Sequence, residues 1–209
     1  MFIVIEGLDG VGKSTITKAL AREVDAVMLA TPGDKFNSMR SELELIYKDN
    51  HQARQLFYMS TVVNISEQVR DLISKGKSVI VDRYWLSTQV YHQWKSENHH
   101  FELTDVENSI LVPDVTFYLQ LPLEHRKKRL LSRNGNTAED NLTIIDTTDT
   151  ELNSLYLQYS STSIAGHWVS INTGETVDEI IKNIGTELKE FKQGKSKKIR
   201  MNSAVFTDS

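Results

Sequence analysis

The 209-residue chain contains no cysteine, which excludes a disulfide framework and a zinc site built from thiolates. It also lacks an apolar run of roughly 20 residues, the length that a membrane-spanning helix requires. Its 24 lysines and arginines stand against 28 aspartates and glutamates, so there is no overall basic field to attract nucleic acid. The first residues show no positively charged targeting segment. We therefore expect a cytoplasmic protein that binds neither a membrane nor nucleic acid.

Short apolar segments alternate with stretches of helical periodicity along most of the chain. Five buried strands are predicted, at residues 2–5, 26–30, 78–81, 115–121 and 168–171. Helical patterns cover residues 15–24, 52–74 and 175–191. This alternation favours an α/β fold, a five-stranded parallel sheet with helices on both faces. The pattern stops near Gln193, which predicts a single domain over residues 1–192 and a polar, flexible tail over 193–209.

The segment from Gly7 to Thr15, GLDGVGKST, follows the first strand and opens the first helix. In this context the pattern Gly-x4-Gly-Lys-Ser is typical of a phosphate-binding loop. Glycine permits backbone angles that let successive amides point at one anion, and the helix start adds the positive end of its dipole. We expect Lys13 to reach the β- and γ-phosphates of a nucleoside triphosphate and Ser14 to ligate Mg²⁺.

A second motif, Asp82-Arg83-Tyr84, ends the third predicted strand. Ligands of open α/β sheets bind at the carboxyl ends of the strands. If this strand lies beside the first, Asp82 falls near Ser14, and Arg83 faces the phosphates with a planar fork suited to gripping them. Taken alone, Asp82 and Arg83 fit a structural ion pair equally well, and the neighbouring phosphate loop favours a functional reading.

In order and spacing, these two motifs and the following Ser87-Thr88-x-x-Tyr91 resemble the thymidylate kinase family of nucleoside monophosphate kinases. The stretch VIVDRYWLSTQVYHQW is the closest match, and PDVTFYLQLPLEHRKKRLLSR resembles the family's fourth strand and basic lid helix. The resemblance covers about residues 1–190. It implies a P-loop kinase fold with a small lid over about 126–141, and a homodimer. It also implies Mg²⁺-dependent transfer of the γ-phosphoryl of ATP to a nucleoside or deoxynucleoside monophosphate, dTMP first.

The resemblance assigns ATP to the glycine loop and the lid. The loop carries no arginine at Gly10 or Val11, which resembles the subgroup whose catalytic arginine, here Arg133, comes from the lid. Mg²⁺ would be held by Ser14 and Asp82. The residues expected to bind ATP are Gly10, Val11, Gly12, Lys13, Ser14, Thr15 and Arg129. The residues expected to act in catalysis are Lys13, Arg83, Arg133 and Asp9.

The acceptor nucleotide is assigned in the same way. Phe57 resembles the ring that stacks on the base, and Tyr91 resembles the aromatic residue that packs under the deoxyribose and disfavours a 2′-hydroxyl. Ser87 and Thr88 lie where the family contacts the pyrimidine edge. The residues expected to bind the acceptor are Asp9, Lys35, Phe57, Thr61, Arg83, Ser87, Thr88 and Tyr91.

The chain departs from the family pattern at three places. Thr61 stands where the family usually has an arginine that reads the base, which puts thymine specificity in question. The loop TPGDKF lacks the usual basic residue beside its proline, and Lys35 is the available substitute. The lid sequence after Arg133 has no second arginine. These departures predict a relative with altered acceptor choice or reduced activity.

Two other functions remain open on the sequence. A kinase that phosphorylates a nucleoside or another small acceptor would need a general base, and Asp9 is the candidate. A nucleotide-binding regulatory protein with weakened catalysis would explain Thr61 and the lack of a second arginine in the lid after Arg133.

Overall fold

The sheet has five parallel strands in the spatial order β2-β3-β1-β4-β5, which confirms the predicted fold class. The structure, a computed structural model, describes residues 1–37, 39–96, 101, 103–132 and 138–204. Every predicted strand is present, and no strand end shifts by more than two residues. The strands are β1 (Phe2–Gly7), β2 (Ala26–Ala30), β3 (Ser78–Asp82), β4 (Val115–Gln120) and β5 (His167–Asn172).

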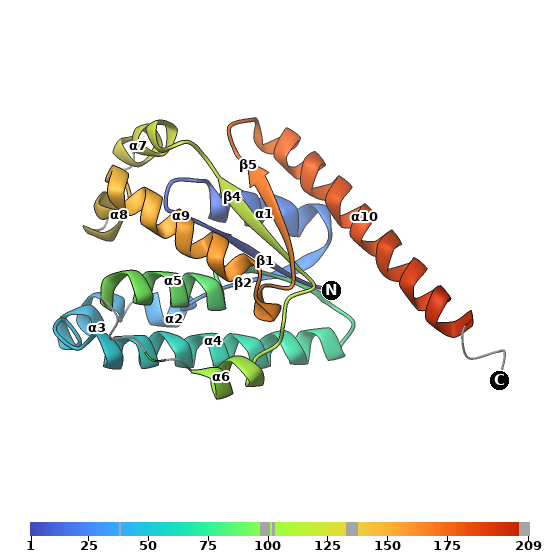
Figure 1. Ribbon diagram of the computed structural model, residues 1–209, viewed down its shortest axis with the longest axis horizontal. Coiled ribbons are helices and arrows are strands. Elements are labelled where there is room, and N and C mark those ends of the chain that lie inside the picture. The colour runs from blue at the N-terminus through green and yellow to red at the C-terminus, as the bar shows by residue number, and fades with distance from the viewer. Residues whose placement is uncertain (38, 97–100, 102, 133–137, 205–209) are drawn as a thin grey trace.

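Helices cover both faces of the sheet (Figure 1). On one face α1 packs against α10, and on the other α5 lies between α4 and α9. The long helices are α1 (Lys13–Glu23), α4 (His51–Ser74), α5 (Trp85–Ser96), α9 (Asp146–Ser160) and α10 (Val177–Ala204). The shorter ones are α2 (Asp34–Asn37), α3 (Arg40–Ile46), α6 (Thr104–Ser109), α7 (Leu123–Leu131), α8 (Ala138–Leu142) and the 3₁₀ turn η1 (Ser163–Ala165).

The central strands are buried on both faces, as expected for a parallel sheet between two helical layers. All six residues of β1 are buried, and so is the apolar middle of β3. In register, Ile5 of β1 lies opposite Asp82 of β3. The phosphate loop therefore leaves the sheet directly beside the Asp82-Arg83-Tyr84 motif, at the carboxyl edge where ligands bind.

Two of the long helices differ from the sequence pattern. Helix α10 continues to Ala204, past residue 191 where the periodicity ends, and Figure 1 shows it running beyond the sheet. The added residues are mostly polar ones of good helix propensity, which give no amphipathic signal. Helix α9 was not predicted, because its buried stripe of Thr148, Leu152 and Tyr156 holds only two apolar residues.

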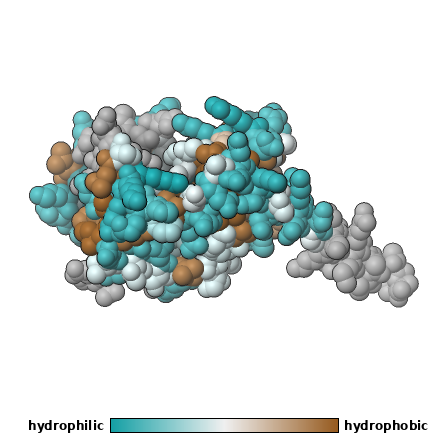
Figure 2. Space-filling view, turned by 90° about the horizontal axis from the view of Figure 1, so that it is seen from above, coloured by the Kyte–Doolittle hydropathy of each residue, from teal (hydrophilic) through white to brown (hydrophobic). Residues whose placement is uncertain are grey.

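Within the described residues, no helix has both the length and the apolar character needed to cross a membrane. The face seen in Figure 2 is mainly hydrophilic, with small separate apolar patches.

Candidate functional site

The phosphate-binding loop curls around a cavity of about 250 Å³ at the carboxyl edge of the sheet. Gly7 begins the loop, and a Cβ there would lie 2.5 Å from the carbonyl oxygen of Leu119 on β4. Gly12 caps α1 in the left-handed region, at φ 98°. The buried Lys13 donates from Nζ to the Leu8 carbonyl at 2.8 Å. The described lining consists of Asp9, Gly10, Gly12, Lys13, Ser14, Thr15, Ala30, Thr31, Asp82 and Arg83.

Two oxygen ligands meet in this cavity. The hydroxyl of Ser14 donates to Oδ2 of Asp82 at 2.8 Å. The other carboxylate oxygen, Oδ1, is buried and has no hydrogen-bond partner among the described residues. A hydroxyl and an unsatisfied carboxylate are hard oxygen donors of the kind that Mg²⁺ prefers. The residues predicted to hold the metal therefore lie together.

Arg83, the residue after β3, bonds to β1, to the residue after β2 and to the phosphate loop. Its backbone lies in the left-handed region, at φ 64°, an uncommon conformation for a residue other than glycine. The Arg83 amide donates to the Ile5 carbonyl at 3.0 Å, and the Arg83 carbonyl accepts from the Thr31 hydroxyl at 2.9 Å. These bonds fix the strained backbone and aim the guanidinium at Asp9, with which it forms an ion pair.

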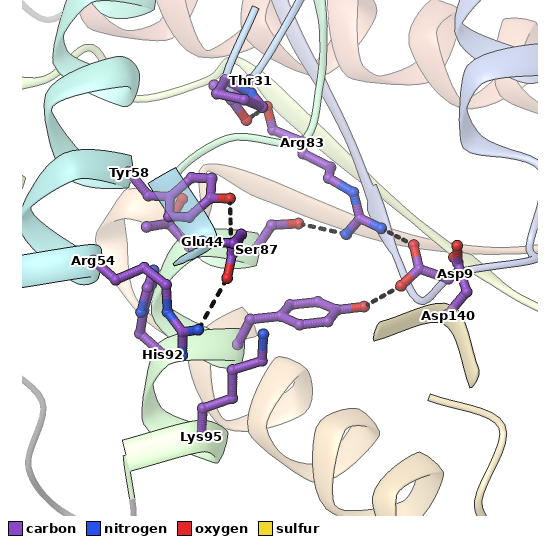
Figure 3. A pocket seen from close by; sticks show the side chains of 13 residues that line it. Asp9, Thr31, Glu44, Arg54, Tyr58, Arg83, Ser87, His92, Lys95 and Asp140 are labelled. Atoms are coloured by element: carbon purple, nitrogen blue, oxygen red, sulfur yellow. Dashed lines mark hydrogen bonds and ion pairs between the residues drawn. The ribbon is translucent and has the colours of Figure 1, made fainter. Parts of the chain in front are cut away.

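Figure 3 shows Asp9 facing the Arg83 guanidinium, and Tyr91 completes this cluster. The Tyr91 hydroxyl donates to Oδ2 of Asp9 at 3.0 Å, and the Tyr91 ring lies 5.4 Å from the Arg83 guanidinium carbon. Burial alone would raise the pKa of Asp9, but Arg83, Lys13 and the Tyr91 hydroxyl together hold that pKa well below its usual range. Burial and the Asp9 carboxylate raise the pKa of Tyr91. At neutral pH Asp9 is thus charged and Tyr91 is neutral.

Beneath this cluster lies Glu6, which the sequence reasoning did not single out. It is fully buried in β1. Its Oε1 accepts from the amides of Tyr84 and Ser87 at 3.0 and 3.2 Å, and its Oε2 accepts from the Ser87 hydroxyl. Burial raises the pKa of Glu6. Glu6 thus satisfies amides at the start of α5, and a glutamate inside an otherwise apolar strand was the sequence signal for it.

A second cavity, of about 220 Å³, opens on the other side of the Asp9–Arg83 pair. The predicted acceptor residues Asp9, Arg83, Ser87, Thr88 and Tyr91 all line it. The sequence reasoning missed Glu44 on α3, Arg54 and Tyr58 on α4, and His92 and Lys95 on α5, because these lie on three separate helices. Thr31, Pro32 and Asp140 complete the lining.

Three predicted acceptor residues do not belong to the described lining of this cavity. The Phe57 ring packs against Phe36, with centroids 5.8 Å apart. Thr61 is 1% exposed, and its hydroxyl donates to the Tyr58 carbonyl at 2.7 Å. Lys35 is exposed on α2. Arg133, predicted to act in catalysis, lies outside the described residues.

The two arginines of α7 hold the phosphate loop from outside. Arg129 donates to the carbonyls of Val11, at 3.1 Å, and Thr173, at 2.8 Å. Arg126 is 1% exposed, pairs with Asp149 and donates from Nε to the Asp9 carbonyl at 2.7 Å. Arg126, at the predicted start of the lid, is thus a buried brace between the loop and α9.

The geometry described above agrees with comparisons to known proteins. A family model described as thymidylate kinase matches residues 5–184. A probable thymidylate kinase of Thermococcus kodakarensis is 31% identical over 158 residues, which cover 68% of this chain and 77% of the relative. The thymidylate kinase of Desulfotalea psychrophila is 26% identical over 204 residues, covering 90% and 94%.

Two solved structures have the same fold. The thymidylate kinase of Candida albicans superposes with a TM-score of 0.70 at 21% identity, covering 91% of this chain and 92% of that one. A deoxyadenosine kinase from M. mycoides superposes with a TM-score of 0.65 at 20% identity, covering 91% and 100%. At these identities the superpositions speak for the fold alone. The family match over most of the sequence decides the assignment: the chain belongs to the thymidylate kinase family.

Proposed function

We propose that this protein, an ATP-dependent nucleoside monophosphate kinase by family, phosphorylates dTMP to dTDP. The observation that carries the proposal is the position of the Asp9–Arg83 pair. Asp9, Thr31 and Arg83 line both cavities, so the pair stands between the phosphate-loop cavity and the second cavity. A donor triphosphate in the first and an acceptor phosphate in the second would meet at these side chains.

The chemistry needs positioning and charge neutralisation more than proton removal. The phosphate of a nucleoside monophosphate is already an anionic nucleophile, so no general base has to act on it. Lys13 and the loop amides bind the donor phosphates, and Arg83 turns its fork towards the acceptor phosphate. Tyr91, held by Asp9, supports the deoxyribose. Arg133 remains the candidate for contact with the transferring phosphoryl.

Ser14 and Asp82 would hold the Mg²⁺ that accompanies ATP. Their hydrogen bond and the unsatisfied Oδ1 of Asp82 fit a metal that prefers oxygen ligands. When bound, Mg²⁺ neutralises charge on the phosphate oxygens. The protein's own part is to keep both oxygen ligands beside the loop.

The test is an assay of diphosphate formation from a panel of nucleoside monophosphates with ATP and Mg²⁺. We expect turnover of dTMP, and a loss of at least about 100-fold in kcat/KM for both Lys13→Ala and Arg83→Ala. Lys18→Ala and Arg22→Ala are matched controls, because both side chains are exposed on α1 and should leave the rate unchanged. A purified, folded protein that forms no diphosphate from any monophosphate would refute the proposal.

The same assay decides between the alternatives. A nucleoside kinase would need Asp9 as a base, but the ion pair with Arg83 lowers the pKa of Asp9 and makes it a poor proton acceptor. Supplying thymidine beside dTMP tests this directly. A regulatory protein would bind ATP tightly without turnover.

We also infer a homodimer formed along α4, by analogy with the family. Leu56 on the outer face of this helix is 47% exposed, and Val63 is half-buried. The same face carries exposed Ser60 and Asn64, so the interface would be partly polar. Light scattering that gives the mass of one chain at micromolar concentration would contradict this inference.

A further inference from the structure

The second cavity ends, away from the phosphate loop, in a group of three side chains (Figure 3). Glu44 comes from α3, and Arg54 and Tyr58 come from α4. Nη1 of Arg54 donates to Oε2 of Glu44 at 3.0 Å, and the Tyr58 hydroxyl donates to Oε1 of Glu44 at 2.8 Å. A hydrogen-bonded charge pair therefore lies opposite the Asp9–Arg83 pair, at the end of the cavity where the base of a bound monophosphate would lie.

Arg54 has the right position to replace the arginine that is missing at Thr61. The two residues are about two helical turns apart on α4, so they share one face of the helix. Arg54 is 8% exposed and lines the cavity. Its buried Nε has no hydrogen-bond partner among the described residues. Because an unpaired buried donor is costly, an acceptor atom on a ligand would stabilise this arrangement.

Glu44 complements Arg54 as a negatively charged hydrogen-bond acceptor. Partial burial would raise its pKa, but the Tyr58 hydroxyl and the Arg54 guanidinium hold that pKa below its usual range, so the group is ionised at neutral pH. A carboxylate has about four lone-pair positions, of which Tyr58 and Arg54 use two. With its side chain 32% exposed, Glu44 can still accept from an N–H on a ligand and has none to donate.

His92 adds no charge to this end of the cavity. Burial, together with the charges of Arg54, Lys95 and His51, lowers the pKa of His92 to about 3. Its ring lies 5.6 Å from that of Tyr58. The charged groups that line this end of the cavity are therefore Arg54, Glu44 and Lys95.

The pyrimidine bases differ in the hydrogen-bond donors and acceptors that they would present to Glu44 and Arg54. Cytosine presents an amino donor beside two acceptors, N3 and O2, and a carboxylate is the usual partner of that amine. Thymine presents a single N–H, at N3, between two carbonyl oxygens, so it can also donate to the carboxylate and accept from Arg54, but it lacks the exocyclic amine. We propose that Glu44 and Arg54 read the acceptor base and admit a pyrimidine with an exocyclic amine, a cytosine-bearing monophosphate, beside dTMP. This inference rests on the proposed kinase function.

The test compares dTMP with 5-methyl-dCMP, which carries the same methyl group and differs only along the edge that Glu44 and Arg54 would read. The quantity is the ratio of kcat/KM for 5-methyl-dCMP to kcat/KM for dTMP. We expect the wild-type protein to turn over both, and Glu44→Gln to lower the ratio about tenfold, because an amide replaces a purely accepting carboxylate. Glu42→Gln, on the same helix and exposed, is the control that should leave the ratio unchanged.

A second variant tests Arg54. Arg54→Lys keeps the charge and removes the fork, so we expect the KM of both monophosphates to rise about tenfold while the KM of ATP stays constant. Arg70→Lys, also on α4 but outside the described cavity lining, is the control.

Each outcome has one reading. A fall of the ratio by about threefold or more in Glu44→Gln supports the inference. A smaller change, or wild-type turnover of dTMP without 5-methyl-dCMP, overturns it and leaves the proposed function standing. An unchanged acceptor KM in Arg54→Lys overturns the role of Arg54. If no monophosphate yields a diphosphate, the proposed function fails and this inference fails with it.

Discussion

At the scale of single residues, the fold lowers the pKa of Lys13 into the range in which enzymes are usually assayed. Burial and the nearby Arg83 cation outweigh three carboxylates and lower the pKa of Lys13 to about 8. Below that pH the side chain is protonated, and above it the nucleotide-free protein holds a neutral amine. We expect ATP affinity to fall as pH rises through about 8, because binding must then also protonate Lys13. Calorimetric titration with ATP between about pH 6.5 and pH 9.5 measures this.

Lys13→Arg is the comparison for that measurement. A guanidinium stays charged throughout this range, so the variant's affinity, whatever its absolute value, should show a flatter pH profile. Equal slopes in the two proteins would show that another group causes the pH dependence.

Sequence reasoning found those residues of the site that stand in contiguous motifs. Asp9 follows β1 and Arg83 follows β3, so their meeting follows from placing the two strands side by side. Tyr91 stands in the motif that continues into α5 and reaches Asp9 from there. Glu44 and Arg54 could not be found in this way. Glu44 on α3 and Arg54 on α4 meet through a side-chain hydrogen bond, and nothing in the local sequence fixes that contact.

At the scale of elements, the start of α5 depends on Glu6. Its carboxylate accepts from the amides of Tyr84 and Ser87, next to the strained backbone of Arg83. Glu6→Ala leaves these buried amides unpaired, and we expect the free energy of unfolding to fall by about 3 kcal/mol. Urea denaturation followed by circular dichroism checks this value.

Glu6→Gln separates positioning from stability. The glutamine oxygen can still accept from both amides. The NH₂ group that replaces Oε2 of Glu6 is a donor and cannot accept from the Ser87 hydroxyl. We expect a rise of about fivefold in the acceptor KM, with the KM of ATP unchanged, because Ser87 and Arg83 are displaced together. If both KM values rise equally, Glu6 has only a structural role.

Elements with a strong apolar pattern were predicted well, and those without one were not. The five strands and α4 carry runs of Val, Ile and Leu, and their predicted limits lie within two residues of the structure. The buried face of α9 mixes polar and apolar residues, so the sequence shows no clear helical periodicity there. Packing against α5 stabilises α9, although the local sequence of α9 gives no clear helical signal.

At the scale of the whole molecule, the body of the protein is expected to end near residue 192. Phe191 stacks on His167 of β5, with ring centroids 5.1 Å apart, and the next three residues are exposed. Removing residues 193–209 should change the melting temperature by no more than about 2 °C and leave kcat/KM unaltered. Differential scanning calorimetry and the diphosphate assay test both points. A marked loss of either would show that the end of α10 serves stability or catalysis.

Asp9 has a further consequence for how the enzyme's preferences can change. The same carboxylate borders both cavities, and its main chain is held by Arg126. Under the proposed function, we therefore expect a substitution at Asp9 to change the binding of both nucleotides together. We expect changes in acceptor choice to occur at the far end of the second cavity, where Glu44 and Arg54 lie away from the phosphate loop. Relatives with new acceptors should thus differ at those positions while keeping the shared carboxylate.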